Sequence, residues 1–312
     1  MSPRWTSAAV VGAGTIGLAW AALFAANDIE VRITDPREDL DEAVDAALPM
    51  LAESIPGAEI ERLRARITTT PDLAKAVETA DLVQENGPER LDFKQRLFAE
   101  IAEHAPQDAV LASSSSGIVA GDIAAELPDR VAARLLIAHP FNPPQVVPLV
   151  EIVPSGRTDE RVANEAFEFY RALGKTPVRL HKEVSGFVAN RLQSAVMRES
   201  VSLVLRGVVS AEELDTVMKA SLGGRYATIG PFESFHLGGG PGGIRHMMEH
   251  LGRGMAQRWQ ELGEPELTDE AIAEIVAQTE SSYGTGESAY IERARQRDRK
   301  HSTINNALNA EE

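Results

Sequence analysis

Short runs of apolar and β-branched residues alternate with longer amphipathic segments over about the first 180 residues. The short runs predict strands, and the longer segments, rich in Ala, Leu and Glu, predict helices. The expected strands are Ala8–Val11, Glu30–Thr34, Arg66–Thr69, Leu82–Gln84, Val110–Ala112, Leu135–Ala138, Val150–Val153 and Val178–Leu180. The clearest helices are expected at Ile16–Ala26, Leu40–Ala52, Phe93–Glu103 and Arg161–Leu173. This alternation predicts an α/β fold with a doubly wound parallel sheet.

The pattern changes at about Ser185, where β-branched clusters thin out and apolar residues take helical spacing. One long helix is expected over Phe187–Arg206, and Ser210–Glu213 has the spacing of a capping box that opens the next helix. The sequence therefore predicts an α/β domain over residues 1–183 and an all-helical domain over residues 184–312.

Composition excludes several functional classes. The chain lacks cysteine, which removes disulfides and thiolate ligands, and its net charge of −16 without a basic run argues against nucleic-acid binding. The longest apolar stretch, Leu18–Ala26, is too short for a membrane span, and no secretory signal is visible, so a cytoplasmic location is expected. Two further expectations are a flexible loop at Gly238–Gly243 and a frayed end from His301.

A glycine-rich turn follows the first expected strand and opens a helix; it consists of Gly12, Ala13, Gly14, Thr15, Ile16 and Gly17. This is the dinucleotide-binding fingerprint of Rossmann-type domains, in which the helix N-terminus offers N–H groups to the pyrophosphate. Asp35 ends the next strand, where a carboxylate accepts ribose hydroxyls and repels a 2′-phosphate. The expected cofactor is therefore NAD rather than NADP, although Arg37 nearby could weaken the preference.

A histidine, His139, lies at the end of the sixth expected strand, where open α/β sheets bind their ligands. A free imidazole titrates near neutrality, which suits it to accept a proton from an alcohol. Glu151 lies in an otherwise apolar strand, and a buried carboxylate usually has a partner because leaving it unpaired is costly. The alternative is a histidine bonded for structural reasons alone. The serine run Ser113–Ser116 is expected at the same edge of the sheet and offers hydroxyl donors.

These motifs occur in the order found in the 3-hydroxyacyl-CoA dehydrogenase superfamily, which the chain resembles over nearly its whole length. The segments that carry the resemblance are the glycine turn with Asp35, Gln84–Glu89 with Lys94, the serine run, His139–Pro143, Leu149–Glu151 and Ser185–Arg191. Within the superfamily, Leu222–Pro231 is similar to the branch of lambda-crystallin and L-gulonate 3-dehydrogenase. Gly242–His246 is similar to L-carnitine dehydrogenase.

The resemblance implies reversible hydride transfer between a 3-hydroxy acid and NAD. It implies that His139 is the catalytic base and that Glu151 orients it. Ser116 and Asn190 would hydrogen-bond the substrate oxygen or the histidine, with Ser115 as the alternative to Ser116. The resemblance also implies a homodimer built through the helical domain.

Two cofactor contacts and one substrate contact complete the expected site. By resemblance, Glu89 and Lys94 would lie along the cofactor.

Segment 37–61 holds eight acidic residues and one basic residue, a local charge of about −7 that would repel a polyanionic CoA tail. A small free hydroxy acid is therefore expected, and its carboxylate needs a cation. Arg225, in an expected loop Gly223–Tyr226, is the candidate; a surface ion pair is the alternative for this arginine.

Three other functions compete with this interpretation. The substrate could instead be a 3-hydroxyacyl-CoA, such as 3-hydroxybutyryl-CoA, or L-carnitine. His246, Glu249 and His250 form the pattern His-x-x-Glu-His, which on a helix could bind zinc for a hydrolase, but no third ligand is evident. A non-catalytic, structural NAD-binding protein is disfavoured because the candidate catalytic residues are all present.

Overall fold

A computed structural model describes residues 5–310, apart from the side chain of Asn309. The chain divides into two compact units, one ending at Asn190 and one beginning at Arg191. No helix within residues 5–310 is long and apolar enough to cross a lipid bilayer.

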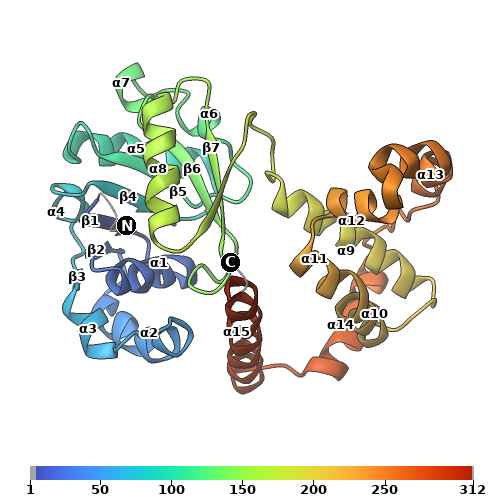
Figure 1. The fold of residues 1–312 in the computed structure, drawn as a ribbon. Helices are drawn as coiled ribbons and strands as arrows, with labels where there is room; N and C mark the ends of the chain where they lie inside the picture. Colours follow the sequence, from blue (N-terminus) through green and yellow to red (C-terminus); the bar gives the residue numbers. More distant parts are fainter. Residues whose placement is uncertain (1–4, 311–312) are drawn as a thin grey trace. The chain divides into compact units, whose positions relative to one another are not determined.

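The first unit is built on one eight-stranded sheet with the strand order β3-β2-β1-β4-β5-β6-β7-β8 (Figure 1). All neighbouring strands are parallel except β6 and β7, which run antiparallel. The strands are β1 Ser7–Val11, β2 Glu30–Thr34, β3 Ile67–Thr69, β4 Leu82–Glu85, β5 Val110–Ser113, β6 Leu135–Pro140, β7 Leu149–Pro154 and β8 Thr176–Arg179. The expected doubly wound sheet is confirmed. The strand order changes direction at β1, with β2 on one side and β4 on the other. Open α/β sheets bind nucleotides at such a point.

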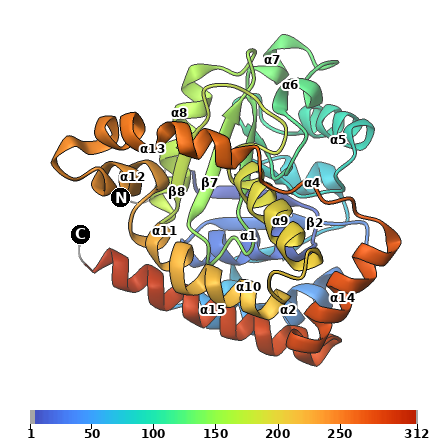
Figure 2. The ribbon, with the colours of Figure 1, turned by 90° about the vertical axis from the view of Figure 1, so that its right-hand side faces the viewer.

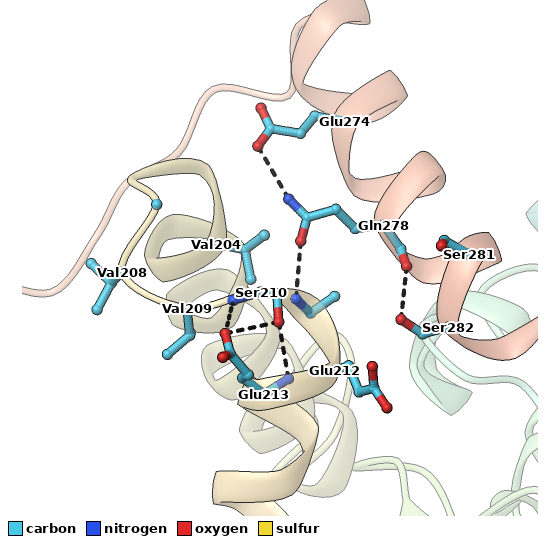
Figure 3. Close-up of a pocket in the computed structure, with 12 residues that line it drawn as sticks. Val204, Val208, Val209, Ser210, Glu212, Glu213, Glu274, Gln278, Ser281 and Ser282 are labelled. Carbon is cyan, nitrogen blue, oxygen red and sulfur yellow. Dashed lines mark hydrogen bonds between the residues drawn. The ribbon is translucent and has the colours of Figure 1, made fainter.

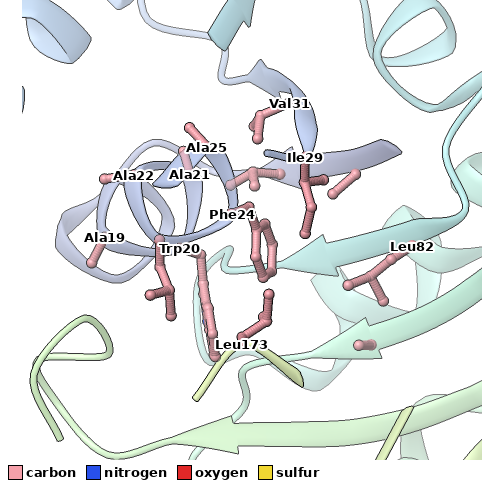
Figure 4. Close-up of a cluster of buried hydrophobic side chains, with 14 of the residues drawn as sticks. Ala19, Trp20, Ala21, Ala22, Phe24, Ala25, Ile29, Val31, Leu82 and Leu173 are labelled. Carbon is pink, nitrogen blue, oxygen red and sulfur yellow. The ribbon is translucent and has the colours of Figure 1, made fainter. Parts of the chain in front are cut away.

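Helices flank the sheet and bury both of its faces in separate apolar cores. They are α1 Thr15–Ala26, α2 Leu40–Ser54, α3 Ile60–Ala65, α4 Leu73–Val77, α5 Leu91–His104, α6 Ala120–Ile123, α7 Asp129–Ala132 and α8 Glu160–Ala172. Trp20 and Phe24 of α1 are fully buried and point into one of these cores (Figure 4). This packing fixes α1, and with it the glycine turn from which α1 begins.

The second unit consists of helices (Figure 2). Helix α9, Ala189–Leu205, leads into it, and the others are α10 Ala211–Met218, a π-helical turn Lys219–Gly223, α11 Gly224–Thr228, α12 Pro231–Gly238, a 3₁₀ turn Gly240–Gly242, α13 Gly243–Trp259, α14 Asp269–Tyr283 and α15 Glu287–Asn309. The expected all-helical character of this region is confirmed.

The capping box expected at the start of α10 is present: Ser210 and Glu213 exchange hydrogen bonds between side chain and backbone. Beside it lies a surface pocket of about 450 Å³ between α10 and α14 (Figure 3). There the Gln278 side chain accepts a hydrogen bond from the Ala211 N–H at 3.0 Å. This hydrogen bond joins α10 to α14.

Several local expectations were wrong. The helix expected from Phe187 begins at Ala189, because Gly186 and Phe187 have φ angles of 74° and 48° that a right-handed helix cannot contain. The loop expected around Arg225 is the π-helical turn followed by α11.

The glycine-rich segment near residue 240 contains a single 3₁₀ turn between two helices, so the expected loop is reduced to a few residues. The end expected to fray from His301 continues α15 as far as Asn309. Once a helix is nucleated, each further residue adds a hydrogen bond, so α15 extends through this segment even though His, Ser, Thr and Asn are weak helix formers.

Candidate active site

The glycine turn between β1 and α1 has the shape that a dinucleotide requires. Gly12 has a φ of 98°, and a Cβ on Gly17 would lie 1.9 Å from the Gly12 carbonyl oxygen, so the turn excludes side chains at both positions. A Cβ on Gly14, by contrast, would meet no protein atom within 4 Å. Gly14 faces open space, which leaves room for a phosphate beside the start of α1.

The start of α1 is suited to an anion. Gly14 is its N-cap and provides no side-chain hydrogen bond, so the N–H groups of the first turn, at Thr15, Ile16 and Gly17, lack intrahelical acceptors. Asp35, at the end of β2, accepts a hydrogen bond from the Ala13 N–H at 2.8 Å. Its carboxylate is thereby tied to the glycine turn, at the position expected for a ribose contact. These features fit NAD.

The serine run 113–116 begins at the last residue of β5, and its four serines have four different environments. Ser113 donates to Glu85 at 2.5 Å, Ser114 donates to Asn86 at 2.8 Å, and Ser115 donates to Glu89 at 2.7 Å. Ser115 is buried, whereas Ser116 is exposed. The hydroxyl of Ser116 is therefore the more accessible of the two candidates, which favours Ser116 over Ser115 for a substrate contact.

Glu89 holds the backbone of this serine turn. One of its oxygens accepts hydrogen bonds from the N–H groups of Ser116 at 3.0 Å and Gly117 at 2.9 Å. Burial by itself would raise the pKa of the Glu89 carboxyl, but the Ser115 hydroxyl, the Lys94 charge and the backbone donors outweigh it and lower the pKa. Glu89 is thus an ionised cap on the turn; its expected position along the cofactor stays a prediction.

Lys94 forms a buried ion pair with Glu85. The ammonium lies 2.8 and 2.9 Å from the two carboxylate oxygens, and the side chains of Lys94 and Glu85 are 1% and 0% exposed. Glu85 also accepts a hydrogen bond from the Gly87 N–H at 2.6 Å. Lys94 was expected along the cofactor; in the structure its charge is paired inside the protein. Sequence reasoning gave Glu85 no role, although an acidic residue ending an apolar strand was a visible signal.

The candidate catalytic pair is formed by two adjacent strands. His139 of β6 and Glu151 of β7 are direct partners in the antiparallel register, and His139 Nδ1 lies 2.9 Å from a Glu151 oxygen. Both side chains are buried, and the Phe187 ring packs against the imidazole with centroids 5.2 Å apart. Because an ionised carboxylate only accepts hydrogen bonds, Nδ1 carries a proton, and in the neutral imidazole the lone pair is then on Nε2.

The charge of Glu151 is stabilised by three donors. Burial would raise the pKa of this carboxyl, but hydrogen bonds from His139 and from the N–H groups of Val188 and Ala189 outweigh burial and lower the pKa. The backbone donors lie 2.9 and 3.1 Å away. These two backbone hydrogen bonds hold segment 184–190 on the sheet unit. The expected domain boundary had assigned this segment to the helical domain.

A chain of contacts joins the four candidate catalytic residues. Asn190, next to Ala189 at the start of α9, donates from its side chain to the Ser116 carbonyl oxygen at 3.2 Å. The links therefore run from His139 through Glu151 and the start of α9 to the serine turn. Such an arrangement can take a proton from an alcohol and orient its oxygen; the individual roles stay predictions.

The remaining candidates lie in the second unit. Arg225 is an exposed residue of α11. His246 and His250 lie one turn apart on α13, with ring centroids 4.0 Å apart and the rings tilted by 36°, and Nδ1 of His250 lies 2.9 Å from the His246 carbonyl oxygen. Within residues 5–310, no three His, Asp or Glu side chains are grouped to hold a metal ion. The zinc alternative therefore gains no third ligand from the described residues.

Comparisons with known proteins match both units of the chain. The model of the 3-hydroxyacyl-CoA dehydrogenase NAD binding domain matches residues 7–184, and that of the 3-hydroxyacyl-CoA dehydrogenase C-terminal domain matches residues 186–277. A 3-hydroxyacyl-CoA dehydrogenase from Gibberella moniliformis is 42% identical over 255 residues, covering 81% of this chain and 79% of the relative. An L-carnitine dehydrogenase from Nocardiopsis dassonvillei is 38% identical over 304 residues, covering 96% and 91%.

Solved structures agree with this assignment. An NAD⁺-dependent dismutase, 5-formyl-3-hydroxy-2-methylpyridine 4-carboxylic acid 5-dehydrogenase, is 26% identical with a TM-score of 0.76, and the match covers 97% of this chain and 98% of that one. A 3-hydroxyacyl-CoA dehydrogenase from Archaeoglobus fulgidus is 30% identical with a TM-score of 0.68, covering 95% and 97%. Both family domains are present in order, and the first contains a glycine turn shaped for a dinucleotide; the chain therefore belongs to the 3-hydroxyacyl-CoA dehydrogenase family and is an NAD-dependent oxidoreductase.

Proposed function

We propose that this enzyme interconverts a small free 3-hydroxy acid and its 3-keto acid. The observation that carries the oxidation chemistry is the buried His139–Glu151 pair at the same edge of the sheet as the glycine turn. A histidine with a free Nε2 and an ionised partner is suited to take the hydroxyl proton as the alcohol is oxidised.

The residues of the chain divide this task. NAD, when bound, supplies the nicotinamide that accepts the hydride. His139 Nε2 takes the proton of the substrate hydroxyl, and the Glu151 carboxylate stabilises the imidazolium that results. Ser116 and Asn190 orient the substrate oxygen toward that nitrogen. In the reverse direction His139 returns the proton.

The negative charge of segment 37–61 and the substrates named for several relatives support a free acid over a CoA ester. The acids of segment 37–61 repel a polyanion, although Arg64, just beyond that segment, bonds Asp41 and Asp45 and reduces the local negative charge. Among the relatives, L-carnitine dehydrogenases and the pyridine carboxylic acid dehydrogenase are named for free acids, whereas others are named for CoA esters. L-Gulonate and L-carnitine are therefore the first candidates, and 3-hydroxybutyryl-CoA is the alternative.

A substrate panel tests the proposal. NAD reduction is measured with L-gulonate, L-carnitine, 3-hydroxybutyrate and 3-hydroxybutyryl-CoA, each over a range of concentrations. We expect the highest kcat/KM for one of the free acids. Efficient turnover of the CoA ester with no activity on the free acids would overturn the substrate class and leave the dehydrogenase assignment intact.

Cofactor preference is expected to depend on Asp35. The wild-type enzyme should bind NADH more tightly than NADPH, because this carboxylate repels a 2′-phosphate. Asp35→Ala should weaken NADH binding by about tenfold, the value of a charge-assisted hydrogen bond, and relax the preference. Asp35→Asn is the matched control, since it removes the charge but keeps an acceptor for the Ala13 N–H. Equal affinities of the wild type for both cofactors in fluorescence titrations would contradict the prediction.

Substrate carboxylate binding is expected to depend on Arg225. A guanidinium grips a carboxylate through two parallel hydrogen bonds worth roughly 1.5 to 3 kcal/mol. Arg225→Met should therefore raise KM for the acid by about ten- to a hundredfold. The variant should also lose the ability to distinguish the acid from its methyl ester. An unchanged KM would place the carboxylate at another cation.

We also propose that the enzyme is a homodimer through its helical unit. Large apolar side chains on that unit are exposed, including Met197 of α9, Val217 of α10 and Ile272 of α14. Contiguous exposed apolar patches commonly mark protein–protein interfaces, and the family resemblance implies a dimer through this unit. Light scattering should give twice the chain mass of 33.7 kDa; a monomer at micromolar concentration would disprove this.

A further inference from the structure

A line of hydrogen-bonded polar side chains, buried at one end and partly buried at the other, runs from α8 to the glycine turn. Neither the catalytic pair nor the cofactor contacts described above use it. It begins at Tyr170 of α8, whose hydroxyl donates to the side-chain oxygen of Gln84 on β4. The Gln84 amide donates to the Ser114 hydroxyl at 2.8 Å, and Ser114 donates to the Asn86 side-chain oxygen at 2.8 Å. Tyr170 and Gln84 are fully buried.

The direction of every hydrogen bond in this line is determined. Burial raises the pKa of Tyr170, so the phenol keeps its proton, and that proton is donated to the Gln84 side-chain oxygen. With the Gln84 oxygen taken by Tyr170, the Gln84 amide must face Ser114. Ser114 already accepts from Gln84 and from the Trp20 indole N–H at 3.2 Å, so its single proton goes to Asn86. Ser114 is the node at which three elements meet: α1, β4 and the end of β5.

The line ends on the cofactor turn. With its oxygen engaged by Ser114, the Asn86 amide nitrogen faces backbone and donates to the carbonyl of Gln84 at 2.8 Å, with that of Val11 at 3.4 Å. The Asn86 N–H also donates to the Val11 carbonyl at 2.8 Å. Asn86 packs directly against the turn, because a Cβ on Gly12 would lie 3.0 Å from its backbone carbon and one on Gly17 3.4 Å from its amide nitrogen.

We infer that Ser114 and Tyr170 are positioning residues for NAD binding, acting through Asn86 on the glycine turn. Trp20 adds a second route, since it lies on α1, the helix whose N-terminus faces the phosphates. Ser114 therefore differs from the neighbouring serines in its hydrogen-bond partners. The hydroxyls of Ser113 and Ser115 are bonded to Glu85 and Glu89, and Ser116 is exposed. The inference rests on NAD binding and not on the identity of the substrate.

Titration of NADH into the full-length enzyme without substrate tests this inference. Ser114→Ala leaves Asn86 without its donor, and we expect the Kd for NADH to rise roughly tenfold, within the range of coupling between linked sites. Tyr170→Phe frees the Gln84 amide and should raise the Kd in the same direction by a smaller factor. Because both act through one line, the double variant should bind no more weakly than Ser114→Ala alone.

Ser54→Ala is the matched control. Ser54 is also buried, and its hydroxyl donates to the Leu51 carbonyl within α2, away from the turn. This variant should keep the wild-type Kd even if its Tm falls. A network that only stabilised the core would lower the Tm of the Ser114 and Tyr170 variants and leave their Kd unchanged well below that temperature; this result would overturn the inference. If Ser114→Ala does not fold, an unchanged Kd in Tyr170→Phe has the same consequence.

Discussion

His139→Gln is expected to lower kcat by a factor of about 10² to 10⁴, the usual contribution of a positioned general base. Glutamine has no group that can take the hydroxyl proton near neutral pH, while the glycine turn and Asp35 are untouched. The Kd for NADH should therefore remain close to that of the wild type. Steady-state kinetics on the best substrate of the panel, together with NADH titration, separates the two effects.

Two companion variants sharpen this test. His181→Gln, at an exposed histidine, is the matched control and should retain wild-type kcat. Glu151→Gln should lose less activity than His139→Gln and should move the acidic limb of the kcat profile to lower pH, because a neighbouring negative charge favours protonated imidazole. A His139→Gln variant within tenfold of the wild type would remove this residue from proton transfer.

The fold was predictable because its signals are local. Strand runs such as Glu30–Thr34 alternate polar with β-branched residues, and the glycine turn marks the end of one strand and the start of a helix. The antiparallel direction of β7 was not predictable in this way, because the residues of a single strand do not encode the direction in which it runs in the sheet. Yet that reversal is what sets Glu151 opposite His139.

The site was predictable in its residue types but less so in its connections. The family resemblance placed Lys94 along the cofactor, and only the structure pairs it with Glu85. The start of α9 was expected at Phe187, because no sequence pattern predicts the positive φ of this residue. Contacts between residues distant in the chain, such as Tyr170 with Gln84, depend on packing that periodicity does not specify.

Lys94→Met is expected to destabilise the sheet unit by about 3 to 5 kcal/mol, the cost of leaving one member of a buried ion pair without its partner. Glu85 would keep hydrogen bonds from Ser113 and Gly87 but would carry an uncompensated charge at 0% exposure. Urea unfolding without NAD, followed by tryptophan fluorescence, measures the loss. Adding Glu85→Gln should recover part of it, because the double variant no longer buries a charge.

Lys75→Met is the matched control for Lys94→Met. Lys75 is 72% exposed and lies 3.7 Å from Asp72, so losing this pair should change stability by no more than about 0.5 kcal/mol. The competing role for Lys94, a direct cofactor contact, predicts the opposite pattern: unchanged unfolding without NAD and a raised Kd for NADH. Because Lys94 is 1% exposed and both Glu85 oxygens lie within 2.9 Å of its ammonium, we expect the stability effect to dominate.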